Sequence, residues 1–321
     1  MATETELLIQ NGKAVYAPSV QEGIEWSTER SGAPGQLAFK ILEDKNLKIT
    51  EGNVVRFKYR KKNVFYGFIF TRKIDSDGFV SVTAYDQLRY LKNKDTYVYA
   101  DKSLSWLVKR IASDFGLKKG TIENTKYKIP SRVEDGQTLF DMIANAHDLT
   151  MMNLGTMYVL FDDFGKLSLK SIGKMKVDIV IDKETGQSYE YTSSIDSDVY
   201  NQVKLYYDNK DTGKREIYIA RSTKNINAWG MLQYYEKLEK GENGKKKANT
   251  LLKLYNARKR NLTIKNAVGD YRVRAGSMIV VSMKVDNEKI LQYMLVEKCK
   301  HIYKENEHWM DLTLWGGDFS A

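Results

Sequence analysis

The single cysteine of the chain lies close to two of its three histidines, in the segment CKHIYKENEHWMDLTL at 299–314. Cys299, His301 and His308 are residue types that bind zinc or, beside carboxylates, support acid–base catalysis. Strand alternation would put Cys299 and His301 on one face, about 7 Å apart, and a turn at 304–307 would return His308 to that face. Three such ligands and an open position meet the minimum for a catalytic zinc.

The residues around these side chains favour a structural role instead. No second set of hydrogen-bonding partners is evident for the candidate ligands, and their spacing matches no usual zinc pattern. The matching arm of an internal repeat, residues 71–74, reads TRKI and contains neither cysteine nor histidine. We therefore expect the 291–315 hairpin to close a small β-barrel. We predict no catalytic residues, no metal site and no cofactor.

Other reactive groups in the chain lead to the same prediction. The sequence lacks the G-x-S-x-G, P-loop and H-E-x-x-H motifs. Asp162 and Asp163 form a carboxylate pair, but they stand in a hairpin turn before Gly165, where we expect them to be exposed. His147 lies at the edge of the apolar face of a predicted helix, and such a histidine is typically packed or hydrogen-bonded.

Strands must position most of these residues. The N-terminal part of the chain is rich in aromatic and β-branched runs, and strands resume near Val199 and again at the C-terminal end. Between them, Ser103 and Thr138 are typical N-caps of two helices. Two further helical runs, AWGMLQYYEKLEK and KKKANTLLKLYNARKR, are predicted within 226–260.

Two strand-rich stretches of the chain, residues 37–86 and 262–316, resemble each other. They place residues of similar size and polarity in the same order. Gly52 matches Gly276 with one gap, FVSVTAYD matches WMDLTLWG without a gap, and GFIF falls opposite YMLV. This self-similarity predicts a duplicated β-domain.

The expected fold class is a β-rich α+β protein with two similar small, tube-like β-barrels that carry inserted α/β and helical segments. We assign residues 1–95 to the first barrel domain and 96–187 to an inserted α+β domain. Residues 188–321 form the second barrel domain, with a helical insertion at about 226–260.

Composition limits the partners. The net charge of +10 is moderate and spread along the chain, so it permits a polyanionic partner without requiring one. Basic clusters such as KYRKK at 58–62 are expected to be solvated surface. No apolar run approaches the ~20 residues needed to span a bilayer, so no membrane anchor is expected.

Several motifs resemble those of a known family. In the first repeat they are ITEGNVVRF, VFYGFIFTRKI and FVSVTAYDQLRYLKN. In the second they are SSIDSDVYNQVKLYY, GDYRVRAGSMIVV and MLVEKCKHIYKENEHWMDLTL. Together they resemble the baseplate hub proteins of contractile phage tails, the late control protein D family, which includes the hubs of PBSX-type prophages and of tail-like bacteriocins. The likeness covers nearly the whole chain, and its motifs are structural rather than catalytic.

This resemblance implies a homotrimeric ring in which each chain supplies two tube-like barrels, so that the ring has pseudo-six-fold symmetry. Such a ring would adapt a hexameric tail tube to a trimeric spike. The implied partners are the tail tube ring, other baseplate proteins, the tape measure protein and a spike, expected as a separate protein because Ala321 follows the second barrel directly. The implied location is the baseplate of a virion tail or tail-like particle assembled in the bacterial cytoplasm. The family is not enzymatic, and DNA would be a partner only if it passes through the channel.

Two other classes of function remain open from the sequence. A nucleic-acid-binding barrel would carry basic residues interleaved with stacking aromatics on one sheet face. The segment KYRKKNVFYGF has this character, although its aromatics also suit a core. A cell-wall hydrolase would use catalytic Glu and Asp side chains, for which the sequence offers no distinct motif.

Overall fold

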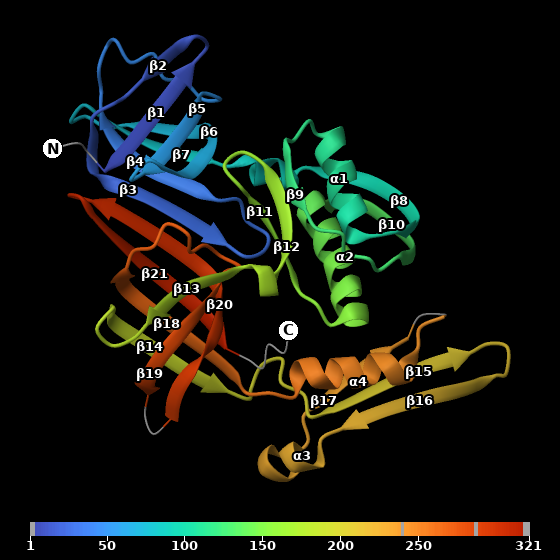
Figure 1. The fold of residues 1–321 in the computed structure, drawn as a ribbon. Helices are drawn as coiled ribbons and strands as arrows, with labels where there is room; N and C mark the ends of the chain where they lie inside the picture. The colour runs from blue at the N-terminus through green and yellow to red at the C-terminus, as the bar shows by residue number, and fades with distance from the viewer. Residues whose placement is uncertain (1–3, 239–240, 286–287, 317–321) are drawn as a thin grey trace.

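The structure is a computed structural model that describes residues 4–238, 241–285 and 288–316. Strands dominate these residues, as the sequence predicts. Two sheet-rich bodies lie one above the other, and smaller bodies containing the helices lie beside them (Figure 1). Within the described ranges, no helix has both the length and the apolar character needed to cross a membrane.

The main sheet has 13 strands and contains both repeats. Its first half consists of β1 (Thr5–Asn11), β2 (Ala14–Tyr16), β3 (Val20–Glu29), β4 (Gln36–Leu42), β5 (Val54–Tyr59), β6 (Lys62–Ile74) and β7 (Phe79–Tyr85). Its second half consists of β13 (Lys176–Ile181), β14 (Gly186–Ser194), β18 (Lys259–Val268), β19 (Met278–Val285), β20 (Glu288–Lys304) and β21 (Glu307–Gly316).

The two halves repeat one strand order. The first runs β3-β4-β7-β6-β5 and the second runs β14-β18-β21-β20-β19. Both carry an irregularity at the same place, between Ile69 and Thr71 in the first half and between Val296 and Lys298 in the second. A shared order and a shared bulge confirm the duplication, because a bulge changes the register of every residue beyond it.

The register corrects one detail of the alignment. Phe68 pairs with Tyr85 in the first half, and Leu295 pairs with Trp315 in the second. Phe68 is therefore equivalent to Leu295, so GFIF corresponds to MLVE and not to YMLV. The sequence alignment was one residue out in this arm because it lacked the cross-strand partners that fix register.

The halves do not close into separate barrels. Instead β20 pairs with β3, and this pairing joins both halves into one continuous sheet. The reason is the length of β20, which has 17 residues. Its first part pairs with β19, and its last part pairs with β21 on one side and β3 on the other. One edge of each half thus forms its backbone hydrogen bonds with the other half, and not with the opposite edge of its own half as in a closed barrel.

The strands that pair with β5 and β19 on their outer sides break the repeat. β1 lies antiparallel to β5, whereas β13 lies parallel to β19. Relative to its own half, β13 therefore runs in the direction opposite to that of β1. β13 comes from the region predicted as an insertion (96–187), yet its partner belongs to the second half.

The middle of the chain forms a compact α+β unit beside the first half. Its elements are η1 (Gln87–Lys92), β8 (Lys94–Lys102), α1 (Leu104–Asp114), β9 (Lys119–Ile122), β10 (Ile129–Thr138), α2 (Leu139–Leu154), β11 (Tyr158–Asp162), β12 (Leu167–Ser171) and η2 (Ile172–Lys174). Ser103 accepts from the N–H of Trp106, and Thr138 accepts from that of Asp141, so both predicted N-caps are confirmed. His147 is hydrogen-bonded as expected, since its Nε2 accepts from the Tyr158 N–H at 3.1 Å.

A second small unit departs from the prediction of a helical insertion at 226–260. It contains β15 (Gln202–Asn209), β16 (Lys214–Arg221), α3 (Thr223–Trp229), β17 (Gln233–Lys237) and α4 (Gly244–Tyr255). The predicted run AWGMLQYYEKLEK is wrong as a helix, because α3 ends at Gly230 (φ 77°) and QYYEK then forms β17. β17 pairs in parallel with β15, so tertiary pairing decides its conformation. The second run forms α4, as predicted.

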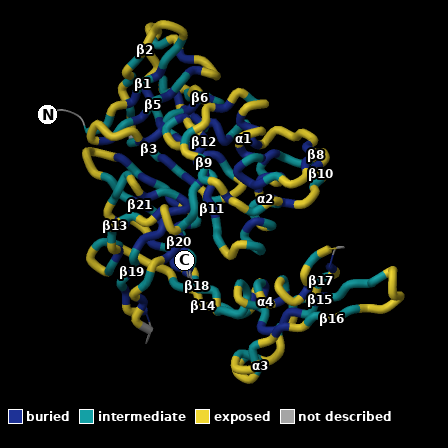
Figure 2. The backbone as a smooth tube through the Cα atoms, turned by 45° about the vertical axis from the view of Figure 1, so that its right-hand side comes forward, coloured by how far each residue is buried: buried dark blue, intermediate teal, exposed yellow. Residues whose placement is uncertain are grey.

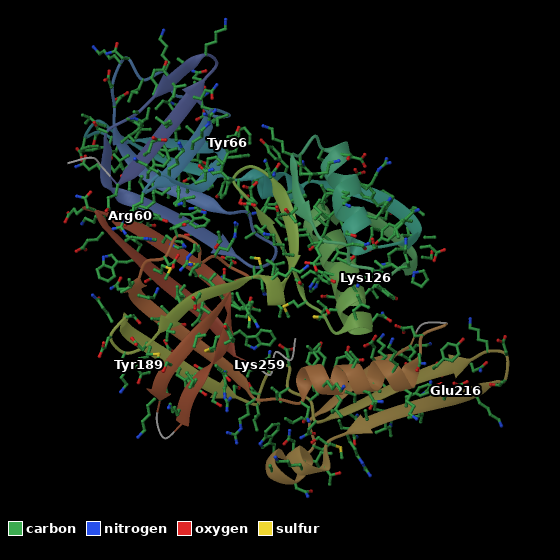
Figure 3. All side chains as sticks on the ribbon, in the orientation of Figure 1. Arg60, Tyr66, Lys126, Tyr189, Glu216 and Lys259 are labelled. Carbon is green, nitrogen blue, oxygen red and sulfur yellow. The ribbon has the colours of Figure 1, made fainter. Side chains whose placement is uncertain are left out.

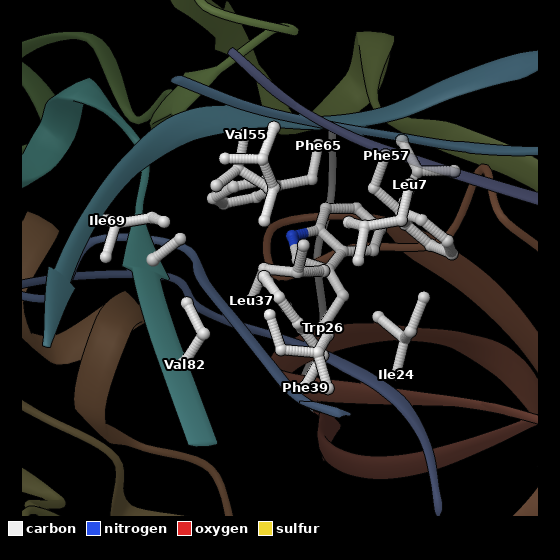
Figure 4. Close-up of a cluster of buried hydrophobic side chains, with 14 of the residues drawn as sticks. Leu7, Ile24, Trp26, Leu37, Phe39, Val55, Phe57, Phe65, Ile69 and Val82 are labelled. Atoms are coloured by element: carbon white, nitrogen blue, oxygen red, sulfur yellow. The ribbon is translucent and has the colours of Figure 1, made fainter. Parts of the chain in front are cut away.

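Separate hydrophobic cores fill these units. Buried residues follow the strands of both sheet halves, while the loops and the β15–β16 hairpin are more exposed (Figure 2). In the first half, Trp26 of β3 lies among Leu37 and Phe39 of the adjacent strand β4 and Phe57 of β5 (Figure 4). Tyr303 of β20 also belongs to this core, so the second half contributes a side chain to the first.

Candidate functional site: the seam between the sheet halves

The side chains that could bind a metal or take part in catalysis lie where the two halves meet. We call this region the seam and define it as residues 298–303 of β20 and 24–29 of β3, which pair antiparallel. Cys299 lies opposite Thr28, and His301 lies opposite Trp26. The rings of His301 and Trp26 are stacked with centroids 4.8 Å apart. The histidine therefore packs across the boundary between the repeats.

The predicted common face of the hairpin is confirmed. Cys299, His301 and Tyr303 are all buried, and the paired strand returns His308 opposite Tyr303. The rings of Tyr303 and His308 stack at 4.2 Å. The three candidate ligands are thus close together, as strand alternation predicts, but on the core side of the sheet.

Hydrogen bonds occupy both ring nitrogens of His301, whereas Nδ1 of His308 is buried without a hydrogen-bond partner. His301 Nε2 lies 2.8 Å from the carbonyl oxygen of Val273, which can only accept, so Nε2 carries the proton. His301 Nδ1 therefore accepts from His308 Nε2, 2.8 Å away. The Cys299 sulfur lies 3.1 Å from His301 Nε2. Because burial keeps both rings neutral, these contacts assign the proton of each ring to Nε2.

Burial keeps these groups uncharged. It lowers the pKa of His301 to about 3, and the nearby His308 acts in the same direction. Burial lowers the pKa of His308 to about 4. It also raises the pKa of the Cys299 thiol. Zinc binding needs a thiolate and imidazole lone pairs, but the Cys299 thiol is held protonated and both ring nitrogens of His301 are hydrogen-bonded, so this arrangement does not fit a zinc site. In the part of the chain that the structure describes, no group of three or more potential ligands could hold a metal ion.

Ion pairs cross the seam on its opposite face. Lys300 Nζ lies 2.7 Å from the carboxylate of Glu25, and Lys298 Nζ lies 3.2 Å from that of Glu29. At the end of the seam, Arg30 Nε is 2.9 Å from both carboxylate oxygens of Glu297. These contacts favour the observed register over a slipped one, because a one-residue slip would bring the wrong side chains together.

A half-buried arginine, Arg274, extends the seam to the middle unit. Arg274 Nη1 donates to the carbonyl oxygen of Asp162 at 2.7 Å. Its guanidinium lies 4.5 Å from the ring centroid of Phe161 and 5.7 Å from that of Trp26. Beside it, the N–H of Ala275 donates to Thr28 Oγ1 at 2.9 Å. Arg274 thus contacts both the first half and the middle unit.

Asp162 is buried, not exposed as the sequence suggested. Its turn packs against the main sheet, so its carboxylate accepts from the Gly165 N–H in a dry environment. Burial raises the pKa of Asp162 to about 6, against the opposing effects of that bond and Arg274. Burial likewise raises the pKa of Asp86 and lowers that of Arg274. Arg274 stays charged at neutral pH because its reference pKa is so high.

Sequence reasoning missed Trp26, Asp86 and Arg274. Asp86 and Arg274 lie within the structural motifs FVSVTAYDQLRYLKN and GDYRVRAGSMIVV, but these motifs carry no catalytic signature, and the common location of the three residues depends on segments far apart in the chain. The N-cap role of Asp86, whose carboxylate accepts from the Leu88 N–H, has a local signal in the segment YDQL. No local signal predicts the contact of Arg274 with Trp26.

The basic cluster at 58–62 is partly neutralised by neighbouring carboxylates. Lys58 lies 2.9 Å from Glu6, and Arg60 lies 3.0 Å from Glu4. Arg60, labelled in Figure 3, is at the tip of the β5–β6 hairpin. These pairs favour a solvated protein surface over a phosphate-binding stripe.

Comparison with known proteins places the chain in a family. Residues 24–315 match the family described as YQBQ-like. The chain is 30% identical over 307 residues to the uncharacterized protein YqbQ of Bacillus subtilis (strain 168), covering 92% of each. It is 29% identical over 307 residues to the phage-like element PBSX protein XkdQ of the same organism, again covering 92% of each.

Solved structures show the same fold at low identity. The 43 kDa tail protein of prophage MuSo2 from Shewanella oneidensis superposes with a TM-score of 0.71 at 12% identity, covering 96% of this chain and 98% of the other. A type VI secretion component of E. coli, c3393, described as structurally similar to the T4 tail proteins gp27 and gp5, gives 0.55 at 9% identity, covering 97% and 76%. The resemblance to phage baseplate hub proteins is confirmed, and the chain belongs to the YQBQ-like family.

Proposed function

We propose that this chain is the structural hub subunit of a contractile phage tail or tail-like particle. Three copies form a ring with pseudo-six-fold symmetry that adapts a hexameric tail tube to a trimeric spike. One observation carries the proposal: each chain contains two sheet halves with the same strand order and the same bulge, joined edge to edge. A repeated unit with an edge-to-edge joint is what a three-fold object needs to match a six-fold one.

The seam supports a mechanical role in this proposal. Stacked rings, a histidine pair and ion pairs fix the relative position of the two halves. In a ring this joint would set the angle between neighbouring units. Uncharged, hydrogen-bonded groups suit that task better than catalysis, so we propose that the chain is not an enzyme.

Each part of the chain has a place in the proposed assembly. Residues 1–95 and 188–321 supply the two tube-like units around the channel. The region 96–187 lies outside the ring, and β13 at its end ties it to the second unit. The proposed partners are a tail tube ring, a separate spike protein, other baseplate proteins and the tape measure protein. The particle would be assembled in the bacterial cytoplasm.

Cryo-electron microscopy of intact tail tips tests the proposal. We expect three copies of this chain in a single ring, with the tube on one side and the spike on the other. Six copies in the ring, or density for this chain only in the sheath or fibres, would overturn it.

A further inference from the structure

The main sheet has several edges without a strand partner among the described residues, including the outer sides of β2 and β13, and two of the others correspond to the seam. One is the outer edge of β14, which pairs only with β18. The other is the last part of β6, residues 71–74, which pairs with β7 on one side and lies beyond the end of β5 on the other. The two edges belong to different halves, and six strands separate them in the sheet, so they do not meet within one chain.

The duplication makes these two edges equivalent to the two sides of the seam. Tyr191 of β14 pairs with Leu262, as Trp26 of β3 pairs with Leu37. β14 is therefore the counterpart of β3. In the same way, residues 71–74 follow their bulge as residues 298–301 follow theirs. The seam joins β3 to β20. The equivalent edges, β14 and residues 71–74 of β6, have no strand partner within the single chain.

We infer that β6 of one chain pairs antiparallel with β14 of a second copy, in the register that the seam uses. This inference rests on the proposed function and specifies its subunit contact. Transfer of the seam register gives four opposed pairs: Thr71 with Ser194, Arg72 with Ser193, Lys73 with Thr192, and Ile74 with Tyr191 of the second copy.

Charges on the outer face agree with this register. In the seam, Lys300 lies opposite Ser27 and forms an ion pair at 2.7 Å with Glu25, two residues along the strand. The counterpart of Lys300 is Lys73, and the counterpart of Glu25 is Glu190. Both are exposed in the single chain. The pairing would repeat the same Lys–Glu contact between chains.

Apolar side chains on the inner face agree as well. Ile74 is 54% exposed and Tyr189 is 43% exposed, whereas the residues that correspond to them in the seam are buried. Tyr189, labelled in Figure 3, lies in the second half, and its counterpart Ile24 is 3% exposed. Pairing of the two edges would cover these apolar surfaces and satisfy the open backbone groups of both strands.

The joint is heterologous, because the edge that it uses in one copy, β6, differs from the edge that it uses in the other, β14. Such a contact forms either a closed ring or an open filament. Since the seam already joins the halves within a chain, repetition between chains alternates the two kinds of joint around a ring. The open edges of β6 and β14 are then covered by neighbouring copies, whereas the outer sides of β2 and β13 take no part in the joint.

Disulfide cross-linking of the full chain tests the register. The variant Lys73→Cys/Thr192→Cys puts thiols on directly opposed residues, whose Cβ atoms lie about 5 Å apart in an antiparallel pair. Mild oxidation is expected to produce covalent dimers and trimers on a non-reducing gel. The matched control is Lys73→Cys/Gln187→Cys, which moves one thiol five residues along β14, or about 17 Å, and should not cross-link. Each single variant controls for the native Cys299.

Charge exchange supplies a second measurement that does not depend on a disulfide. Lys73→Glu and Glu190→Lys should each reduce the fraction of oligomer measured by light scattering, and the double variant should restore it. Lys183→Glu changes the net charge equally but lies in the turn after β13, so it should leave the fraction unchanged.

The outcomes separate the inference from the proposed function. A three-copy ring in the tail tip, together with equal cross-linking of the test and control pairs or with none, would overturn the register and leave the hub role intact. A chain that stays monomeric and uncross-linked at its highest soluble concentration also overturns the inference. The copy number and the position of this chain in the tail tip test the hub role independently.

Discussion

Gly52 and Gly276 occupy equivalent turns in the two sheet halves, as the sequence match predicts. Their φ angles are 83° and 90°. The N–H of Gly52 donates to the carbonyl of Ile69 at 2.8 Å, and the N–H of Gly276 donates to that of Val296 at 2.7 Å. Each glycine thus closes the same turn onto the same bulge. Their surroundings differ, and this difference yields the first prediction.

Alanine at Gly276 should destabilise the protein more than alanine at Gly52. Positive φ costs about 1–2 kcal/mol at either position. An added Cβ meets nothing within 4 Å at Gly52, but at Gly276 it would lie 2.4 Å from Cγ1 of Val159. Overpacking should add about 1–3 kcal/mol to the second variant, measured by urea unfolding. Val159→Ala in the Gly276→Ala background should recover part of that addition, and equal costs at the two glycines would contradict the prediction.

The histidine pair should make stability depend on pH. The folded-state pKa values of His301 and His308, about 3 and 4, lie below the unfolded value of about 6.5. The unfolded chain therefore binds more protons in that window. The histidine contribution is fully present above about pH 6.5 and is lost as the pH falls. Asp162, with its pKa raised to about 6, contributes with the opposite sign.

Comparison of variants isolates the histidine contribution. Gln at position 308 can still donate to His301 but does not titrate. His308→Gln should reduce the pH dependence of the unfolding free energy by up to about 1.4 kcal/mol per pH unit. Denaturant unfolding between about pH 4.5 and 7 measures it. Parallel curves for the wild type and the variant would refute this assignment.

The purified protein should contain no stoichiometric metal. His301 Nε2 is bonded to a backbone carbonyl, and the Cys299 thiol is protonated. Cys299→Ala should cost about 1–3 kcal/mol from lost packing, with Cys299→Val as a control that fills the site. Elemental analysis that finds one zinc per chain, absent from Cys299→Ala, would sink this prediction.

The ion pair between Arg30 and Glu297 should contribute measurably to the seam. Their side chains are 21% and 26% exposed, and one nitrogen contacts both carboxylate oxygens. A double-mutant cycle to alanine should give a coupling energy near the upper end of the ~0.2–1 kcal/mol range for such pairs. The helical pair Arg110–Asp114 should give about 0.3–0.5 kcal/mol and serves as the comparison. A coupling energy near zero for Arg30 and Glu297 would contradict this prediction.

The sequence by itself determined the local features of this protein. Ser103 and Thr138 cap their helices because an N-cap needs only a hydroxyl and the next few backbone N–H groups. Cys299, His301 and Tyr303 share a buried face because successive strand residues point to opposite sides. The duplication was readable because both copies must place apolar residues in the same order to fill similar cores.

Only the tertiary structure decided how these pieces meet. The seam pairs His301 with Trp26, which lie far apart in sequence, and it replaces two closed barrels with one continuous sheet. The segment QYYEK became a strand because β15 offered it an edge, and Asp162 became buried because its turn packs near Arg274. Such outcomes depend on the competition between alternative long-range pairings, and local periodicity contains no information about which pairing has the lower free energy.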